Sequence, residues 1–150
     1  MAGSSSGGNL AARARKVAHY EEIIEEKLKV ELQGVHDDRE AVHERIAQVL
    51  ELRNNVRMLQ EQQLKSLKTM VNLGSDFYVQ AHVPDTQWIY VSVGLGFHPQ
   101  MTLAEAEAFC VHREAALTTS AEALTERAIQ IKARVKLVMG AIDECIQPPS

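Results

Sequence analysis

The chain has 150 residues and a formal net charge of -4 at pH 7, which suits one domain of ordinary size. The acidic balance argues against a protein that binds nucleic acid through its charge. Cys110 and Cys145 fall on one expected helix, about 50 Å apart at about 1.5 Å per residue. We therefore expect no disulfide between them, and a reducing compartment.

The first ten residues, MAGSSSGGNL, are small and polar. They predict a flexible tail at 1–10, neither a signal peptide nor a transmembrane helix, and residues 147–150 predict a second tail. Arg13, Arg15 and Lys16 follow, and this basic run favours a solvated helix start over a nuclear address.

Residues 11–70 predict a long helix. They contain no proline, and apolar residues recur every seven positions from Leu28 to Val56, before Gln63 interrupts the row ahead of Met70. This repeat is typical of a helix that packs along a narrow seam. Polar residues also lie near the seam, where they either weaken the helix or set its register; they are Arg39, Arg53 and Gln60.

Residues 102–146 predict a second helix with a more regular repeat. Thr102 and Glu105 have the spacing of a capping box, which marks a helix start. Apolar side chains then follow every seven positions, at Leu103, Cys110, Leu117, Leu124, Ile131, Val138 and Cys145. Two such helices joined by a compact connection predict an antiparallel coiled coil. A narrow seam offers no buried pocket, so we expect no enzyme, no catalytic residue and no cofactor.

Residues 71–101, between the two helices, have the composition of β-strands. Alternation puts Phe77, Val79 and Val83 on one face of a strand. A turn at 83–86 leads to a second strand, which presents Ile89 and Val91. Segments 71–73 and 97–101 add two shorter strands, giving four strands in two β-hairpins. The predicted fold class is therefore mainly α with a small β element: two long helices joined by two β-hairpins.

The apolar face of these strands has no evident cover within the chain. Small hairpins are marginal in water, and their edges carry unpaired backbone groups. We therefore predict that they form a subunit interface with other chains. Its expected residues are Phe77, Val79, Val83, Trp88, Ile89, Tyr90, Val91, Val93 and Phe97. Trp88 and Tyr90 fall on the outer face, where they either pack on a helix or contact a partner.

Several segments resemble the α-type subunits of the prefoldin family. They are LRNNVRMLQE at 52–61, VNLGSDFYV at 71–79, VPDT at 83–86, IYVSVGLGF at 89–97 and TLAEA at 102–106. The similarity extends over residues 16–146, is most specific between 70 and 106, and is greatest to the α-type subunits of unconventional, prefoldin-like complexes. It predicts one prefoldin-like domain at 11–146.

The resemblance implies a non-catalytic subunit of a hetero-oligomeric co-chaperone. In that family α-type and β-type subunits meet through their hairpins, and the coiled-coil ends hold unfolded clients. Implied partners are β-type prefoldin subunits, an unconventional-prefoldin scaffold protein, unfolded client proteins and transcription factors, without direct nucleic-acid or membrane binding. The implied location is cytoplasmic and nuclear, and also centrosomal. The alternative is an adaptor, a transcription cofactor or centrosome-associated coiled-coil protein, without holdase activity.

Large apolar residues are frequent at the expected open ends of the two helices. The predicted client contacts are Val17, Tyr20, Ile24, Leu28, Val138, Ile142 and Ile146. A frayed coiled coil would expose them as a soft, multivalent surface. The alternative is that these side chains complete the seam.

Two further patterns do not support chemistry. His82, His98, Cys110 and His112 lack the spacing of a zinc site, so we expect no metal. Gly94 and Gly96 lack the third glycine of a phosphate-binding loop.

Overall fold

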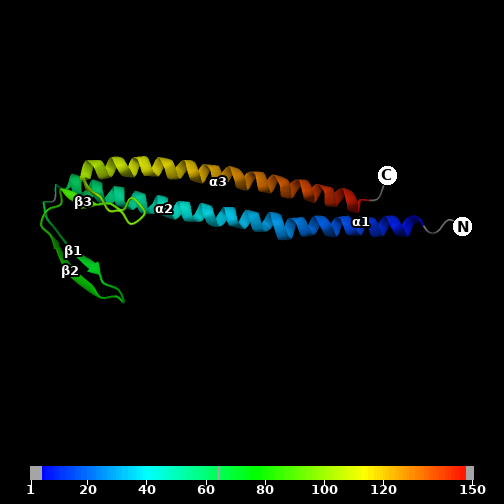
Figure 1. Cartoon of the computed structure of the whole chain (residues 1–150), viewed down its shortest axis with the longest axis horizontal. Helices are drawn as coiled ribbons and strands as arrows, with labels where there is room; N and C mark the ends of the chain where they lie inside the picture. Colours follow the sequence, from blue (N-terminus) through cyan, green and yellow to red (C-terminus); the bar gives the residue numbers. More distant parts are fainter. Residues whose placement is uncertain (1–4, 64, 148–150) are drawn as a thin grey trace. The chain divides into compact units, whose positions relative to one another are not determined.

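The computed structural model describes residues 5–63 and 65–147. Two long helical segments, packed antiparallel, are joined by two β-hairpins (Figure 1), and the predicted fold class is confirmed. The elements in chain order are α1 (Ser5–Glu22), a π-helical turn η1 (Ile23–Leu28), α2 (Lys29–Glu61), β1 (Leu67–Asn72), β2 (Tyr78–Val83), β3 (Trp88–Tyr90), β4 (Gln100–Thr102) and α3 (Leu103–Ile146).

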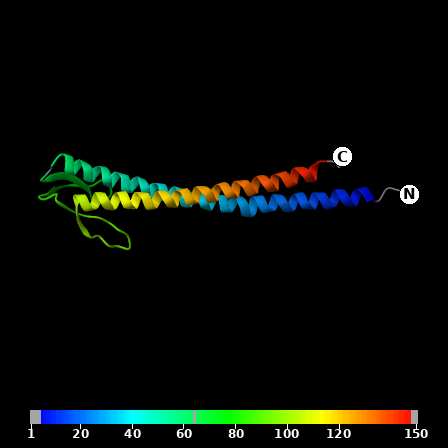
Figure 2. The ribbon, with the colours of Figure 1, turned by 90° about the horizontal axis from the view of Figure 1, so that it is seen from above.

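The chain divides into two compact units, and each contains parts of both helical segments. The terminal unit comprises the described parts of residues 1–43 and 119–150, and the hairpin unit comprises residues 44–118. In each unit the helices run side by side in opposite directions (Figure 2). Each unit also has its own apolar cluster, which follows from the repeat of apolar residues along both helices.

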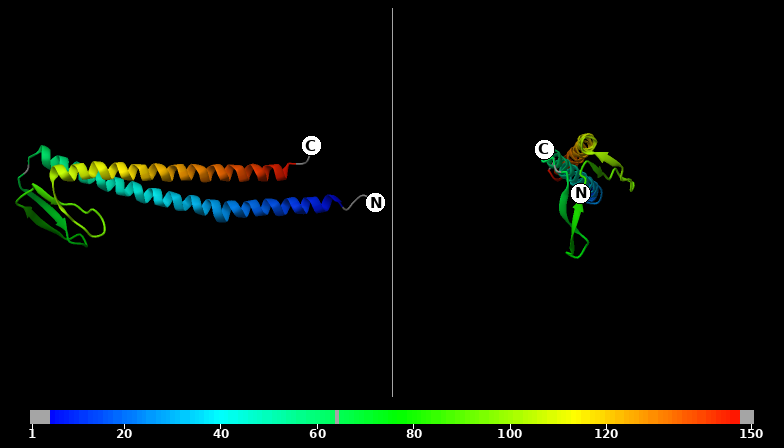
Figure 3. Two further views of the ribbon diagram at one scale, coloured as in Figure 1. Left: turned by 45° about the horizontal axis from the view of Figure 1, so that its top comes forward. Right: turned by 90° about the vertical axis from the view of Figure 1, so that its left-hand side faces the viewer.

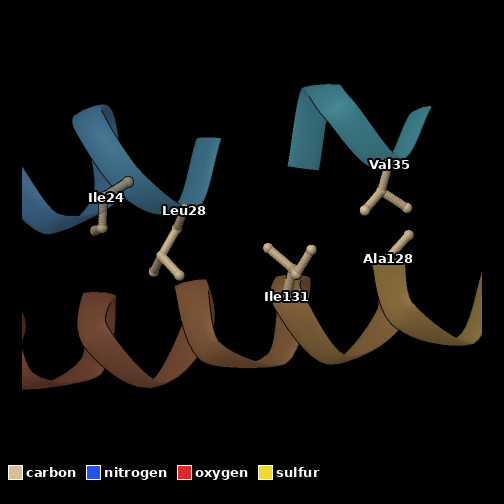
Figure 4. Close-up of a cluster of buried hydrophobic side chains, with 5 residues drawn as sticks. All are labelled: Ile24, Leu28, Val35, Ala128 and Ile131. Carbon is tan, nitrogen blue, oxygen red and sulfur yellow. The ribbon is translucent and has the colours of Figure 1, made fainter. Parts of the chain in front are cut away.

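The terminal unit is held by a buried seam between η1, α2 and α3. Ile24, Leu28 and Val35 face Ala128 and Ile131 across it (Figure 4). Ile131 is 1% exposed, and partly buried Leu124, Val135, Val138 and Ile142 flank it on α3. Arg127 and Glu31 add an ion pair of 3.2 Å between Nη2 and Oε1 at the border of the seam.

The π-helical turn η1 falls where the apolar repeat gains one residue. Half-buried Tyr20 and buried Leu28, along the same side of the seam, lie eight positions apart rather than seven. The backbone N–H of Lys29 donates to the carbonyl of Ile24, five residues back. A π-helical turn holds one more residue than an α-helical turn, so it absorbs the extra position and keeps both flanking stretches on the seam.

The hairpin unit has a second cluster that joins the helices to the β3–β4 hairpin. Its buried residues are Val56 of α2, Ala106 of α3, and Val91, which follows β3. Ile89, Met101 and Phe109 pack against them. The expectation that no part of this chain covers the apolar face of the strands is therefore wrong for the β3–β4 hairpin.

The strands pair differently from the prediction. β1 pairs with β2 and β3 with β4, both antiparallel, so the strands on either side of the 83–86 turn are not partners. The reason is in the backbone, because two runs of positive φ reverse the chain, at 74–76 and at 94–96. The N–H of Phe77 closes the first turn on the carbonyl of Gly74 at 3.0 Å, and Phe97 closes the second on Gly94 at 3.0 Å. The Pro84–Asp85 turn instead links the two hairpins.

The first helical segment ends nine residues before the predicted Met70, at Glu61. Gln63 has a φ of 46°, and its N–H donates to the carbonyl of Gln60 at 3.2 Å. A left-handed residue is a common way to end a helix. The interrupted repeat at Gln63 therefore marked the end, and Met70 belongs to β1.

The ends of the chain also differ from the prediction in part. Residues 5–10, expected in a flexible tail, belong to α1. The rest of the N-terminal tail, at 1–4, and residues 148–150 of the C-terminal tail lie outside the described residues.

The start of α3 is as predicted. Thr102 Oγ1 accepts a hydrogen bond from the N–H of Glu105 at 3.3 Å, and Glu105 Oε2 accepts one from the N–H of Thr102 at 2.8 Å. Together they make the reciprocal capping box. Glu105 Oε2 also accepts a hydrogen bond from the Thr102 hydroxyl at 2.8 Å, and the two hydrogen bonds from Thr102 stabilise the carboxylate and lower the pKa of Glu105 below its ordinary value.

Candidate functional site

The β1–β2 hairpin presents an apolar face that the rest of the chain leaves exposed. The register pairs Val71 with Val79, and Leu67 with Val83. Because alternate residues of a strand face the same side, these four side chains share one face with Thr69 and Ala81. Figure 3 shows the two strands as a separate ribbon beside the helices. Val79 is 46% exposed, and Phe77, in the approach to β2, is 73% exposed.

The opposite face of the same hairpin is mainly polar. It carries Lys68, Met70 and Asn72 of β1 opposite His82, Gln80 and Tyr78 of β2. A sheet with one polar and one apolar face normally buries the apolar one. An exposed apolar face of this kind marks an interaction site.

The β1 strand contributes apolar residues that the predicted interface omitted. Met70, Val71 and Leu73 are exposed, and Val71 shares the apolar face. The apolar repeat predicts helix up to Met70, so it hides the first strand. Gly74 indicates that strand, because a glycine turn ahead of the strand at 78–83 favours a partner strand on its other side.

The β3–β4 hairpin divides the remaining predicted interface residues into two groups. Trp88, Tyr90 and Phe97 are exposed, in agreement with the outer face expected for Trp88 and Tyr90. Val91 is 2% exposed and buried in the hairpin-unit cluster, with Ile89 against it. Val91 is therefore part of this chain's own core, and Val93 is half-buried.

The predicted client contacts lie in the terminal unit, but most of them belong to its seam. Ile24 and Leu28 are buried, and Val138 and Ile142 pack against them. Val17 and Tyr20 are half-buried, and Ile146 is exposed. Near the end of α3, exposed Ile146 is joined by two exposed apolar residues outside the prediction, Leu137, 77% exposed, and Met139.

Two ion pairs link α2 to α3 in the hairpin unit. Arg57 Nε lies 2.7 Å from Glu107 Oε1, and Arg53 pairs with Glu114. The hydrogen bond from Arg57 lowers the pKa of Glu107 below its ordinary value. Arg53, predicted near the seam, therefore has a partner on the facing helix.

The histidine and cysteine side chains are the candidates for metal ligands or for a nucleophile. Among residues 5–63 and 65–147, no three His, Cys, Asp or Glu side chains gather in a way that suits a metal ion. Cys110 is fully buried on the seam, and burial raises the pKa of its thiol, which disfavours the nucleophilic thiolate. In the part of the chain that the structure describes, no helix combines the length and apolar character of a membrane span.

Comparison with known proteins identifies the class that this geometry defines. The sequence matches the family described as "Prefoldin subunit" over residues 28–147. The match includes both hairpins, the capping box and most of the seam. The chain therefore belongs to the prefoldin family, whose members are non-catalytic chaperone subunits.

Individual relatives narrow the resemblance within this family. The chain is 41% identical to the protein UXT homolog of Dictyostelium discoideum, over 90% of this chain and 84% of that protein. It is 40% identical to protein UXT of Bos taurus and 38% identical to that of Homo sapiens. Each of these two alignments covers 89% of this chain and 85% of the relative.

A solved structure supports the fold independently. The cryo-EM structure of filamentous PFD from Methanocaldococcus jannaschii superimposes with a TM-score of 0.60, over 76% of this chain and 93% of that one. At 18% identity this likeness shows the fold alone. Membership of the family implies assembly with other prefoldin subunits.

Proposed function

We infer that this protein is an α-type subunit of a hetero-oligomeric, prefoldin-like co-chaperone, and that it joins β-type subunits through its β1–β2 hairpin. The observation that carries the proposal is the exposed apolar face of that hairpin. Val71, Val79 and Val83 lie together on it, and Phe77 lies beside it. Closing this face and the strand edges against another subunit would remove both from water.

The β3–β4 hairpin has a different part in this proposal. Its inner residues hold it on the helices, whereas its exposed aromatic residues, Trp88, Tyr90 and Phe97, are available to another subunit. Aromatic side chains are frequent at binding hot spots. We therefore place them at the margin of the interface, with the β1–β2 face at its centre.

The test of assembly is the mass of the chain mixed with β-type prefoldin subunits, by light scattering on a sizing column. Val79→Asp places a charge on the exposed face, so we expect the variant to remain folded but to lose the hetero-oligomer. The matched control is His82→Asp, on the polar face of the same strand, which should assemble normally. Equal assembly of Val79→Asp and the unaltered chain would contradict the proposed interface.

We further propose that the end of the terminal unit holds unfolded proteins. Leu137, Met139 and Ile146 support this role, because all three are exposed near the end of α3. Weak apolar contacts gain strength when several subunits act together in an oligomer. Ile24 and Leu28 would contribute indirectly, by holding the seam that presents this surface.

The test of client holding is the turbidity of unfolded actin diluted into buffer with the assembled protein. Leu137→Gln with Met139→Gln should reduce the suppression of aggregation without changing the assembled mass. Met58→Gln with Val111→Gln is the matched control, since both side chains are about half exposed on the helices of the hairpin unit. Undiminished suppression by the first variant would favour an adaptor without holdase activity.

A further inference from the structure

The hairpin unit contains an open groove whose lining residues belong neither to the β1–β2 face nor to the terminal unit. It has a volume of about 340 Å³ and lies between α2, α3 and the segment that follows β3. Val49, Leu52, Val93 and Phe109 line it with apolar atoms, and Leu117 is also among its lining residues. Arg45 of α2 and Arg113 of α3 both line the same groove.

Arg45 and Arg113 differ from the arginines of the hairpin unit that pair with carboxylates. Arg53 and Arg57 pair with carboxylates of α3. Within the described residues, neither Arg45 nor Arg113 has an ion pair, and both side chains are exposed. Two free guanidinium groups beside an apolar surface, on a chain with a net charge of -4, form a local positive site. Guanidinium groups bind carboxylates in a bidentate manner.

The backbone beside the groove suits an extended ligand. Val91 and Val93 donate their N–H groups to the carbonyls of Pro99 and Phe97, both at 3.1 Å. In an antiparallel ladder the intervening residue directs its N–H and C=O toward the other edge. That residue is Ser92, which lines the groove. An extended segment lying there can add hydrogen bonds to this edge.

We propose that this groove binds an extended acidic segment of a partner protein, with a short run of large apolar side chains between carboxylates. The apolar run occupies the surface formed by Leu52 and Phe109, and the flanking carboxylates pair with Arg45 and Arg113. Charge complementarity selects the acidic partner, and the apolar lining distinguishes it from a polyanion that offers charge alone. The proposal concerns a surface other than the β1–β2 face, so it does not depend on the proposed assembly.

The probe is a fluorescein-labelled peptide of eight residues, Asp-Glu-Glu-Phe-Leu-Glu-Asp-Glu, titrated with the full chain and followed by fluorescence anisotropy. We expect saturable binding, at least tenfold weaker binding by Arg45→Glu with Arg113→Glu, and weaker binding as salt rises. A peptide with Lys in place of each acidic residue should not bind. A peptide with Ser in place of Phe and Leu should bind at least tenfold less tightly.

The matched control protein is Arg15→Glu with Arg134→Glu, which changes the net charge equally at exposed positions outside the groove. It should bind the acidic peptide within about twofold of the unaltered chain, because neither arginine lines the groove. Arg45→Gln with Arg113→Gln provides a second groove variant without charge reversal, and circular dichroism checks the folding of each. Absence of peptide binding, or equal loss in the control and the groove variants, would overturn the proposal. Tighter binding of a single-stranded oligouridine at the same arginines would overturn it in favour of nucleic acid.

Discussion

The two β-hairpins of the hairpin unit are built from similar residues and have opposite roles in packing. Both have apolar residues at alternating positions, Val79 and Val83 in β2 and Ile89 and Val91 in β3 and just after it, and both turn through residues of positive φ. The β3–β4 hairpin lies on α2 and α3 through Ile89 and Val91, whereas the β1–β2 hairpin leaves Val71 and Val79 exposed. An apolar strand face is therefore buried or left exposed according to whether the helices of the same unit cover it.

The largest expected effect separates Val91 from Val79. Val91→Asp would bury an unpaired charge in the hairpin-unit cluster and should lower the free energy of unfolding by on the order of 3–5 kcal/mol. Val79→Asp should change it by less than about 0.5 kcal/mol, because its side chain reaches water. Urea unfolding of the two variants measures both. An equal loss in the free energy of unfolding for the two variants would contradict the conclusion that only the β3–β4 hairpin is part of the core.

Substitution of one turn glycine in each hairpin gives a second comparison of the two hairpins. Gly94→Ala and Gly74→Ala each place a side chain at a φ above 100°, with no atom near the added Cβ. The cost is therefore backbone strain alone, about 1–2 kcal/mol. Thermal unfolding should register this cost for Gly94→Ala, whose hairpin belongs to the cluster. Gly74→Ala should leave the melting temperature nearly unchanged and weaken assembly instead.

The capping box ties the end of β4 to the start of α3. Thr102→Ala removes both side-chain hydrogen bonds of Thr102 and should cost about 1 kcal/mol. Thr102→Ser keeps the hydroxyl and should restore most of the stability, so thermal melts of the pair provide the measurement. An unchanged melting temperature in Thr102→Ala would show that β4 positions the helix without the cap.

The smallest effect is a loss of stability in acid. The pKa values of Glu105 and Glu107 are lowered in the folded chain, chiefly by hydrogen bonds from Thr102 and Arg57 respectively. A lowered pKa gives stability that is present above the unfolded value of about 4.3 and is lost as the pH falls through the folded value. Glu105→Gln with Glu107→Gln should flatten this dependence below about pH 4.3, measured by thermal melts across pH. A slope equal to that of the unaltered chain would exclude these two carboxylates.

Much of the helical part of the fold was predictable from the sequence. The repeat in α3 from Cys110 to Ile131 falls on buried or half-buried positions without exception, and Thr102 caps the helix as its spacing predicts. These features are local, because the seven-residue repeat alone predicts the buried face and the capping box alone predicts the helix start. The extra residue between Tyr20 and Leu28 was also present in the sequence, but its consequence, the π-helical turn, depends on the partner helix.

The sequence predicts less well which strands pair and which of their faces are buried. Pro84 and Asp85 favour a turn, and nothing local shows that this turn joins two hairpins rather than closing one. Val91 is buried in a cluster with Val56 of α2 and Ala106 of α3. Such a contact arises from tertiary packing, so alternation alone predicted the same exposure for Val79 and Val91.

The most direct test of the division between the hairpins is amide hydrogen exchange, followed by mass spectrometry, on the chain alone and mixed with β-type prefoldin subunits. For the chain alone we predict slow exchange in residues 88–102 and fast exchange in residues 67–83. On mixing, residues 67–83 should become protected, while residues 88–102 change little. Unaltered exchange in residues 67–83 within a complex of defined mass would contradict the assignment of the β1–β2 face as the assembly surface.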